Sequence, residues 1–252
     1  MELITLEIQG KFAHFRKFYG NNTALSYTLP PRTTITGIFA AILGKERGSY
    51  HQDMASDRLR IGVGIVHPVK KSFHRLNNLM IKGGGDFRGR QGPVQTPFEM
   101  VTPVDLRKNF VTYKVFLSAY LPGEAIFNEI ATHLLNRRRV FNISLGTAFC
   151  HAQLKRIEFF ADSEWRSLEA NGEEWLRLNS AVMIQQVEQI QVSGTQIVLE
   201  EEILPGEFIA DNDRELKSVH KVLFSTSGHD IAVKLKGEYY QVADQYFTFL
   251  ES

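Results

Sequence analysis

Residues 30–44 read PPRTTITGIFAAILG, and this stretch decides how the N-terminal half of the chain is interpreted. Neither proline can donate a backbone hydrogen bond, so the pair ends any preceding regular structure. Thr33 and Thr34 can cap a helix, and Gly44 suits the left-handed position that often follows one. The stretch therefore predicts a short amphipathic helix over Thr34–Leu43. Its expected buried face consists of Ile35, Ile38, Phe39, Ile42 and Leu43.

Regular elements are also predicted on both sides of this helix. Apolar residues at every second position from Ile4 to Ile8 predict a strand with one buried face. The expected order is a strand at Ile4–Ile8, the helix, strands at Arg58–Val66 and Phe110–Tyr120, a helix at Glu124–Leu135 and a strand at Leu154–Phe160. This β-α-β-β-α-β order predicts an α+β, ferredoxin-like domain of the kind found in RNA-recognition modules, over residues 1–165.

A basic insertion interrupts this pattern. Residues 70–91 combine cations with the run Gly83–Gly85, which is typical of a long mobile hairpin or loop. We expect an inserted basic hairpin over about residues 68–110. Residues 166–252 form a smaller β-rich region, with 162–179 as the connection. Its expected strands are 181–191, 195–200, 217–224, 231–236 and 239–248.

Composition narrows the setting of the protein. Charged residues make up 23% of the 252 residues and hydrophobic ones 43%, as in a globular domain. No apolar run reaches the roughly 18 residues that a membrane span needs. The N-terminus lacks the features of a signal peptide, and the single cysteine, Cys150, cannot form an internal disulfide. We expect a cytoplasmic location.

The charge is distributed unevenly along the chain. Residues 11–110 contain 16 Lys and Arg against 6 Asp and Glu, whereas residues 111–252 contain 13 against 20. A basic half suggests a polyanion as partner. A solvated basic surface explains the same count equally well.

The segment after the first strand mixes cations with aromatic rings. Cations can neutralise phosphates, and exposed rings can stack on unpaired bases. The expected RNA-binding residues of this segment are Lys11, His14, Arg16, Lys17 and Tyr19.

Two other places could contact phosphates. Arg32, Thr33 and Thr34 lie where the first helix begins, and a helix N-terminus attracts anions; a rigid helix start with a solvated arginine is the alternative. The insertion contributes further cations on a backbone that can adapt on binding, with a disordered surface loop as the alternative. The cations chosen there are Lys82, Arg88, Arg90, Arg107 and Lys108.

Two features have simpler explanations. Arg137–Arg139 follows the second helix, where cations complement the helix dipole. Tyr113 and Phe116 lie on opposite faces of a predicted strand. One of them could stack on a base, but core packing is the commoner role of such residues.

The stretches Phe12–Arg16 (FAHFR) and Ser26–Gly44 (SYTLPPRTTITGIFAAILG) resemble the N-terminal signature of the fifth CRISPR-associated protein family. This family belongs to the RAMP superfamily, whose members are built on ferredoxin-like domains. The resemblance covers about the first 160 residues. It implies non-catalytic binding of the 5′ handle of CRISPR RNA, as a capping subunit of a type I Cascade complex (I-B-like) for guide-directed DNA recognition. It also implies that the inserted hairpin is a thumb, and that Lys82, Arg88 and Arg90 press against RNA.

The resemblance also implies the partners. These are CRISPR RNA and the backbone and large subunits of a Cascade complex, with target DNA near the adjacent motif as a further candidate. The acidic C-terminal region could face a protein. No cofactor, metal, membrane or small-molecule substrate is expected. His67 and His74, and likewise Cys150 and His151, lack a metal-site spacing.

Two alternatives remain open at the level of sequence. Some members of the family cut precursor CRISPR RNA without metal, using tyrosine, lysine and histidine. Tyr50 and His51 with Lys45, or His14 with Lys17 and Tyr19, could serve such an endoribonuclease. No spacing fixes either set. The second alternative is a generic RNA-binding scaffold.

Overall fold

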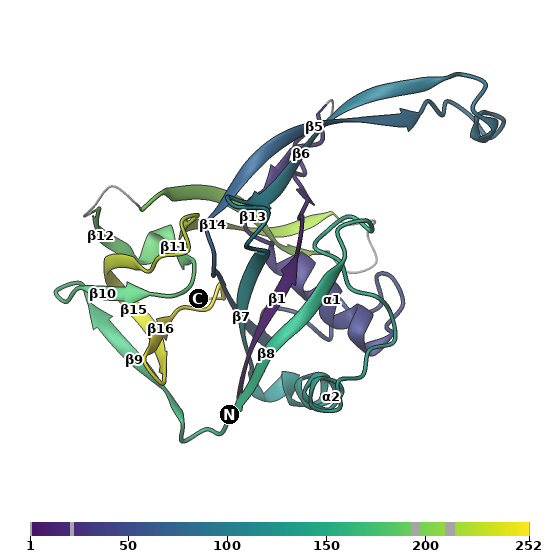
Figure 1. The fold of residues 1–252 in the computed structure, drawn as a ribbon. Coiled ribbons are helices and arrows are strands. Elements are labelled where there is room, and N and C mark those ends of the chain that lie inside the picture. Colours follow the sequence, from purple (N-terminus) through teal and green to yellow (C-terminus); the bar gives the residue numbers. More distant parts are fainter. Residues whose placement is uncertain (1, 21–22, 193–196, 210–214, 252) are drawn as a thin grey trace.

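The computed structural model describes residues 2–20, 23–192, 197–209 and 215–251. Within these ranges the chain folds mostly into β-strands, with two α-helices, α1 (Arg32–Leu43) and α2 (Glu124–Leu135) (Figure 1). No helix in these ranges is long and apolar enough to cross a membrane.

A four-stranded antiparallel sheet forms the centre of the N-terminal part. Its strands are β1 (Leu3–Gly10), β4 (Leu59–Ile65), β7 (Val111–Ala119) and β8 (Ala152–Phe160), in the order β4-β7-β1-β8. Ile4, Leu6 and Ile8 share one core with the apolar faces of α1 and α2. The expected strands therefore exist with bounds shifted by one or two residues, and α2 has the expected bounds.

The second face of β1 is also covered, contrary to the expectation of one buried face. Thr5 and Glu7 are buried as well as their apolar neighbours. Leu3 and Phe116 pack with Trp165, Tyr240 and other aromatic residues from the C-terminal region, and the Phe116 and Phe247 rings stack at 4.1 Å. Alternation along β1 cannot reveal this, because the covering residues lie more than 150 positions away.

Helix α1 begins two residues earlier than expected. Pro31 is the N-cap and makes no side-chain capping bond; its carbonyl accepts the backbone N–H groups of Thr34 and Ile35 at 2.9 and 3.1 Å. The threonines therefore lie inside the first turn rather than capping it. Gly44 ends the helix with a φ of 78°, as expected. A Cβ at Gly44 would lie 2.8 Å from Val140, so a larger residue is excluded by contact as well as by conformation.

The basic insertion is a regular hairpin. Strands β5 (Val69–Leu79) and β6 (Pro93–Pro103) pair without interruption from Val69↔Pro103 to Leu79↔Pro93, and a short 3-10 turn, η1 (Asp86–Arg88), lies at the tip. Figure 1 shows the hairpin projecting from the body. Two short strands at its base, β2 (Phe15–Arg16) and β3 (Ser26–Tyr27), pair with each other. We call the β5–β6 hairpin the arm.

The C-terminal region contains more strands than expected. The segment expected as a connection, 162–179, forms β9 (Trp165–Asn171) and β10 (Leu176–Leu178). The expected strand at 195–200 begins outside the described residues. The two strands expected at 231–236 and 239–248 are one long strand followed by a short one. The remaining elements are β11 (Val182–Met183), η3 (Ile184–Gln186), β12 (Val187–Gln191), β13 (Leu199–Phe208), β14 (Leu216–Ser225), β15 (Ile231–Val242) and β16 (Gln245–Phe247).

The main core crosses the expected boundary near residue 165. Met183, Leu204 and Phe224 belong to the same cluster as the buried face of α1. Buried ion pairs described below join the same two parts of the chain. The division into residues 1–165 and 166–252 therefore does not separate two independently packed cores.

Candidate nucleic-acid interface

The segment after β1 presents three of its five predicted RNA-binding residues on the surface. Lys11, Arg16 and Tyr19 are exposed, and Phe18 beside them is exposed as well. The Lys11 ammonium lies 4.1 Å from the centre of the Phe110 ring and donates to the Leu106 carbonyl at 3.3 Å. These side chains are available to a phosphate or a base.

His14 is not a surface cation. Its ring is buried, stacks on Phe98 at 3.9 Å, and its Nδ1 lies 2.6 Å from the Glu99 carbonyl oxygen. Burial lowers the pKa of His14. A neutral, enclosed imidazole does not neutralise a phosphate, which contradicts the role expected from the sequence.

Lys17 joins two parts of the fold. Its ammonium lies 3.1 Å from a Glu202 oxygen of β13, and Lys71 of the arm lies 2.9 Å from the same oxygen. Burial opposes the charge on Lys17, but the Glu202 carboxylate outweighs it, and the pKa of Lys17 is raised. Its expected contact with RNA is therefore replaced by an internal ion pair at the base of the arm.

Arg32 lies inside the protein, only 2% exposed. Its guanidinium forms an ion pair with Glu251 and donates to the Leu59 carbonyl at 3.0 Å. The expected phosphate contact is wrong for this side chain, because it is already paired and shielded. The alternative of a solvated arginine is also wrong.

The start of α1 nevertheless opens onto a hollow of about 430 Å³, which we call the helix-start pocket. The rings of Tyr50 and His51 lie 4.6 Å apart, and His51 is 5.7 Å from Phe208 of β13. Several sequence-predicted residues are thus brought together from distant segments. The predicted residues that line the pocket are His14, Arg16, Thr33, Thr34, Tyr50 and His51.

The tip of the arm is exposed and basic. The Asp86 carboxylate accepts the backbone N–H groups of Lys82 and Gly83 at 2.9 and 3.0 Å, and the first of these bonds contributes most to the lowered pKa of Asp86. This fixes the turn that carries the cations. Phe87 between them is 69% exposed. The exposed cations of the tip are Lys82, Arg88 and Arg90.

A second exposed basic site lies on the 104–110 loop after the arm. Arg107 and Lys108 are exposed, and the Lys108 ammonium is 3.9 Å from Asp105. Because Lys11 contacts Leu106 and Phe110 of the same loop, the cations at 11, 107 and 108 come from neighbouring segments of the surface.

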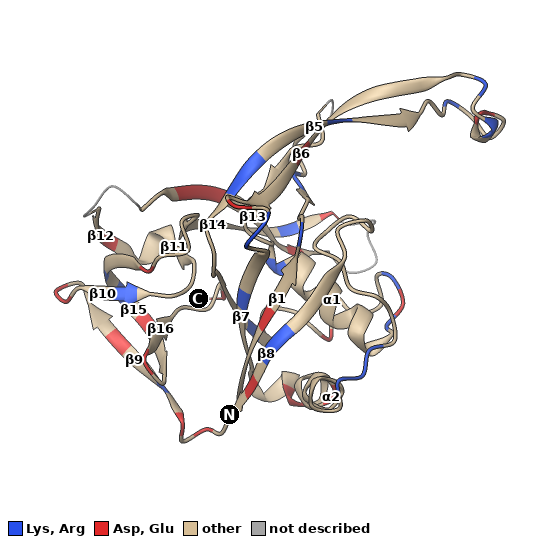
Figure 2. Cartoon of the chain, in the orientation of Figure 1, with Lys and Arg blue, Asp and Glu red and all other residues tan. Residues whose placement is uncertain are grey.

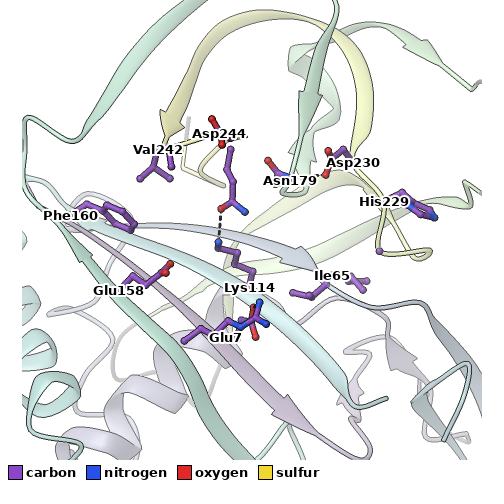
Figure 3. A pocket seen from close by; sticks show the side chains of 15 residues that line it. Glu7, Ile65, Lys114, Glu158, Phe160, Asn179, His229, Asp230, Val242 and Asp244 are labelled. Atoms are coloured by element: carbon purple, nitrogen blue, oxygen red, sulfur yellow. Dashed lines mark hydrogen bonds and ion pairs between the residues drawn. The ribbon is translucent and has the colours of Figure 1, made fainter. Parts of the chain in front are cut away.

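The sheet face opposite the helices is not a platform for bases. Tyr113 is buried with its hydroxyl donating to the Thr28 carbonyl at 2.7 Å, and Phe116 stacks on Phe247. Figure 3 shows the remaining space over this face, a cavity of about 540 Å³ where Lys114 contacts Gln245. Burial lowers the pKa of Lys114. The acidic residues around the cavity are Glu7, Glu158, Asp230 and Asp244, an unfavourable lining for phosphate.

Sequence reasoning assigned no binding role to several polar residues of the 142–147 loop. Asn142, Ser144 and Thr147 line the helix-start pocket, although no motif marks them. Among the described residues, no group of three or more His, Cys, Asp or Glu side chains is arranged to hold a metal ion.

Comparisons with known proteins agree with this arrangement. The sequence model of the family described as "CRISPR-associated protein (Cas_Cas5)" matches residues 3–197. A crystal structure of a CRISPR protein from Archaeoglobus fulgidus superposes with a TM-score of 0.59 at 12% identity, covering 98% of each chain. A chain of a structure named "CRISPR RNA-guided surveillance complex" gives a TM-score of 0.53 at 12% identity, covering 92% of each chain. No curated protein matches the sequence significantly.

Proposed function

The chain belongs to the CRISPR-associated Cas5 family, and from this premise we propose that it binds the 5′ handle of CRISPR RNA as a non-catalytic cap of a type I Cascade complex. The family gives it a CRISPR-associated role. The finer role rests on where the exposed cations lie.

The proposed fold of the N-terminal part is ferredoxin-like. Elements β1, α1, β4, β7, α2 and β8 follow one another as β-α-β-β-α-β, apart from the inserted arm and the short β2–β3 pair. The strand order β4-β7-β1-β8 places the first and third strands of this series in the centre of the sheet. This order supports the assignment, with the arm as the thumb.

The arm is the observation that carries the proposal. It extends from the body as a two-stranded hairpin and holds Lys82, Arg88 and Arg90 on an exposed tip (Figure 2). Phe87 among these cations suits an RNA strand, since cations neutralise phosphates and exposed rings stack on bases. A hairpin without body contacts at its tip is a poor structural element but a suitable clamp.

The handle would lie between the arm and the body. Lys11, Arg107 and Lys108 provide cations beside the base of the arm, and Arg16 and Tyr19 lie on the rim. Thr33 and Thr34 offer hydroxyl groups in the helix-start pocket. His14, Lys17 and Arg32 act in the interior, where they hold these surfaces in place.

The test mixes the purified chain with its repeat RNA in EDTA and resolves bound and cut species on gels. Replacing Lys82, Arg88 and Arg90 by Gln should weaken binding and lower the salt dependence by about 0.7 per lost phosphate contact. Replacing Arg177, Lys234 and Lys236 by Gln removes the same charge from the C-terminal region and should leave binding unchanged. Equal losses in both triple variants would exclude a specific role for the arm.

A metal-independent endoribonuclease is the second candidate, and one observation favours it. The helix-start pocket brings Tyr50, His51 and His14 together, as a cleavage site would require. Lys17 does not join them, because its ammonium is bound to Glu202. A discrete RNA product in EDTA that disappears on His51→Gln would replace the non-catalytic proposal.

Protein partners are proposed for the C-terminal region. Backbone and large subunits of a Cascade complex would adjoin the chain, with target DNA near the adjacent motif as a further partner. A generic RNA-binding scaffold is the remaining alternative. It predicts equal affinity for repeat RNA and unrelated RNA of the same length, which a competition gel measures.

A further inference from the structure

A second basic surface lies far from the arm, between the end of α2 and the edge strand β8. It is a groove of about 920 Å³, which we call the α2–β8 groove. No acidic residue lines it. Figure 2 shows its cations on the turn after α2 and on β8. Its basic residues are His133, Arg137, Arg138, Arg139, Lys155 and Arg156.

The turn after α2 has an unusual residue at its tightest point. Arg137 has a φ of 50°, a left-handed conformation that normally favours glycine. Its N–H donates to the Leu134 carbonyl at 3.1 Å, and the N–H of Arg138 donates to the His133 carbonyl at 2.9 Å. This is a Schellman cap with arginine in the glycine position. The backbone would be more stable with glycine there, so the side chain of Arg137 has a use that outweighs the strain.

The same turn is fixed at its other end. The N–H groups of Val140 and Phe141 donate to the carbonyls of Ile42 and Ala41 at the end of α1, both at 3.0 Å. The backbone of Arg137–Arg139 is therefore held on both sides, while all three side chains are exposed. Cations on a fixed backbone lose less entropy when they bind than cations on a mobile loop.

Helix-dipole compensation does not account for the whole groove. That effect is confined to the last turn of a helix, whereas Lys155 and Arg156 belong to β8. Within the described ranges, no carboxylate lies within ion-pair distance of Arg137, Arg138, Arg139 or Lys155. Four exposed cations thus lie together without internal partners.

The groove continues toward the helix-start pocket. Arg139 and Gln153 also line a hollow of about 520 Å³ that contains Lys11 and Phe149. That hollow shares Asn142 with the helix-start pocket. Exposed rings accompany the cations, with Phe149 beside the middle hollow and Phe159 in the groove itself. Cations interleaved with exposed aromatic rings are typical of a path for a single nucleic-acid strand.

We propose that the α2–β8 groove binds the phosphodiester backbone of a single nucleic-acid strand, at a site separate from the arm. Arg137 and Arg138 contact phosphates from the α2 side, and Lys155 contacts them from the β8 side. Leu135 and Phe159 pack against the bases. The ligand chemistry is common to RNA and DNA, and the experiment separates the two.

The test titrates the full chain with fluorescein-labelled oligouridylate and with oligodeoxythymidylate of the same length, by fluorescence anisotropy. Arg137→Gly removes a cation and relieves the strained φ, so the melting temperature should stay or rise while the affinity falls. The Arg138→Gln/Lys155→Gln variant should lose about tenfold in affinity, and its salt slope should fall by about 1.4 for two lost contacts. Arg177→Gln, an exposed cation on β10, is the matched control and should bind normally.

The two oligonucleotides identify the strand. Equal losses with both show recognition of phosphate alone, and a loss confined to oligouridylate shows that the groove also reads the 2′-hydroxyl. Wild-type affinity and salt slope in both variants overturn the proposal. So does an Arg137→Gly variant that is less stable but binds normally, because the arginine would then serve only the helix.

The arm variant separates this proposal from the proposed function. If the Lys82, Arg88 and Arg90 triple variant binds oligonucleotides normally while the groove variants do not, the groove is confirmed and the arm is not the RNA clamp. The reverse result removes the groove and leaves the arm.

Discussion

Arg32 and Glu251 lie 219 positions apart in the sequence and form an ion pair whose side chains are 2% and 4% exposed. Glu251 also accepts the backbone N–H of Ile61 at 2.7 Å, and Arg32 donates to the Leu59 carbonyl at 3.0 Å. The pair thus joins the start of α1 to β4 and to the last described residue of the chain.

Removing one member of this pair should destabilise the fold strongly. Arg32→Met leaves the Glu251 carboxylate buried without its cation, which costs about 3–5 kcal/mol in the free energy of unfolding. Urea denaturation measures it. The double variant Arg32→Met/Glu251→Leu should lose much less, since no charge is then left unpaired. A stable Arg32→Met chain that fails only to bind RNA would restore the phosphate contact expected from the sequence.

His220 of β14 makes stability depend on pH. Burial, reinforced by the Arg32 guanidinium, lowers the pKa of His220 from 6.5 to about 4, although Glu207 acts in the opposite direction. Between these two values the unfolded chain binds a proton that the folded chain does not. The free energy of unfolding therefore falls as the pH drops through this window, by up to about 1 kcal/mol per pH unit.

The variant that checks this is His220→Gln, which cannot titrate. Urea midpoints measured from pH 7 to pH 4.5 should fall less steeply for His220→Gln than for the wild type. The exposed His229 provides the control, and His229→Gln should keep the wild-type slope. Parallel slopes in all three proteins would show that His220 is not the titrating group.

The stacked rings of Phe116 and Phe247 predict how firmly the C-terminal region covers the sheet. Both rings are fully buried and their planes differ by 7°. Phe247→Ala should reduce the free energy of unfolding by about 3–5 kcal/mol, because it removes buried area and leaves a cavity. Phe73→Ala, at a ring 62% exposed on the arm, should change it by less than about 0.5 kcal/mol. Similar effects of the two substitutions would contradict the packing.

Asp86 should control the order of the arm tip without affecting the body. Asp86→Ala removes the acceptor for the N–H groups of Lys82 and Gly83, so both amides should exchange with deuterium faster. Global stability should change by less than about 0.5 kcal/mol, because the carboxylate is on the surface. Asp86→Asn keeps an acceptor oxygen and should preserve much of the protection. Unchanged exchange in Asp86→Ala would mean that the glycines alone shape the turn.

Local pattern was sufficient for the helices and for the central strands. The apolar spacing in α1 and α2, and Gly44 after α1, depend on neighbours a few residues away, so the sequence predicts them nearly to the residue. The arm was less predictable, because glycines and cations suggest a loop where cross-strand pairing from Val69↔Pro103 onward forms a hairpin. Strand pairing is a relationship between distant segments and leaves little local signal.

The candidate site divides in the same way. The sequence by itself determined which segments are basic and that Lys82, Arg88, Arg90, Arg107 and Lys108 fall in an insertion. Only the tertiary structure decided which cations remain available. It pairs Arg32 with Glu251 and Lys17 with Glu202, and it encloses His14 beside Glu99, whereas Arg137–Arg139 stays exposed. The physical reason is that a charge is neutralised or left free by groups that surround it in space, and these groups come from segments that no local pattern connects.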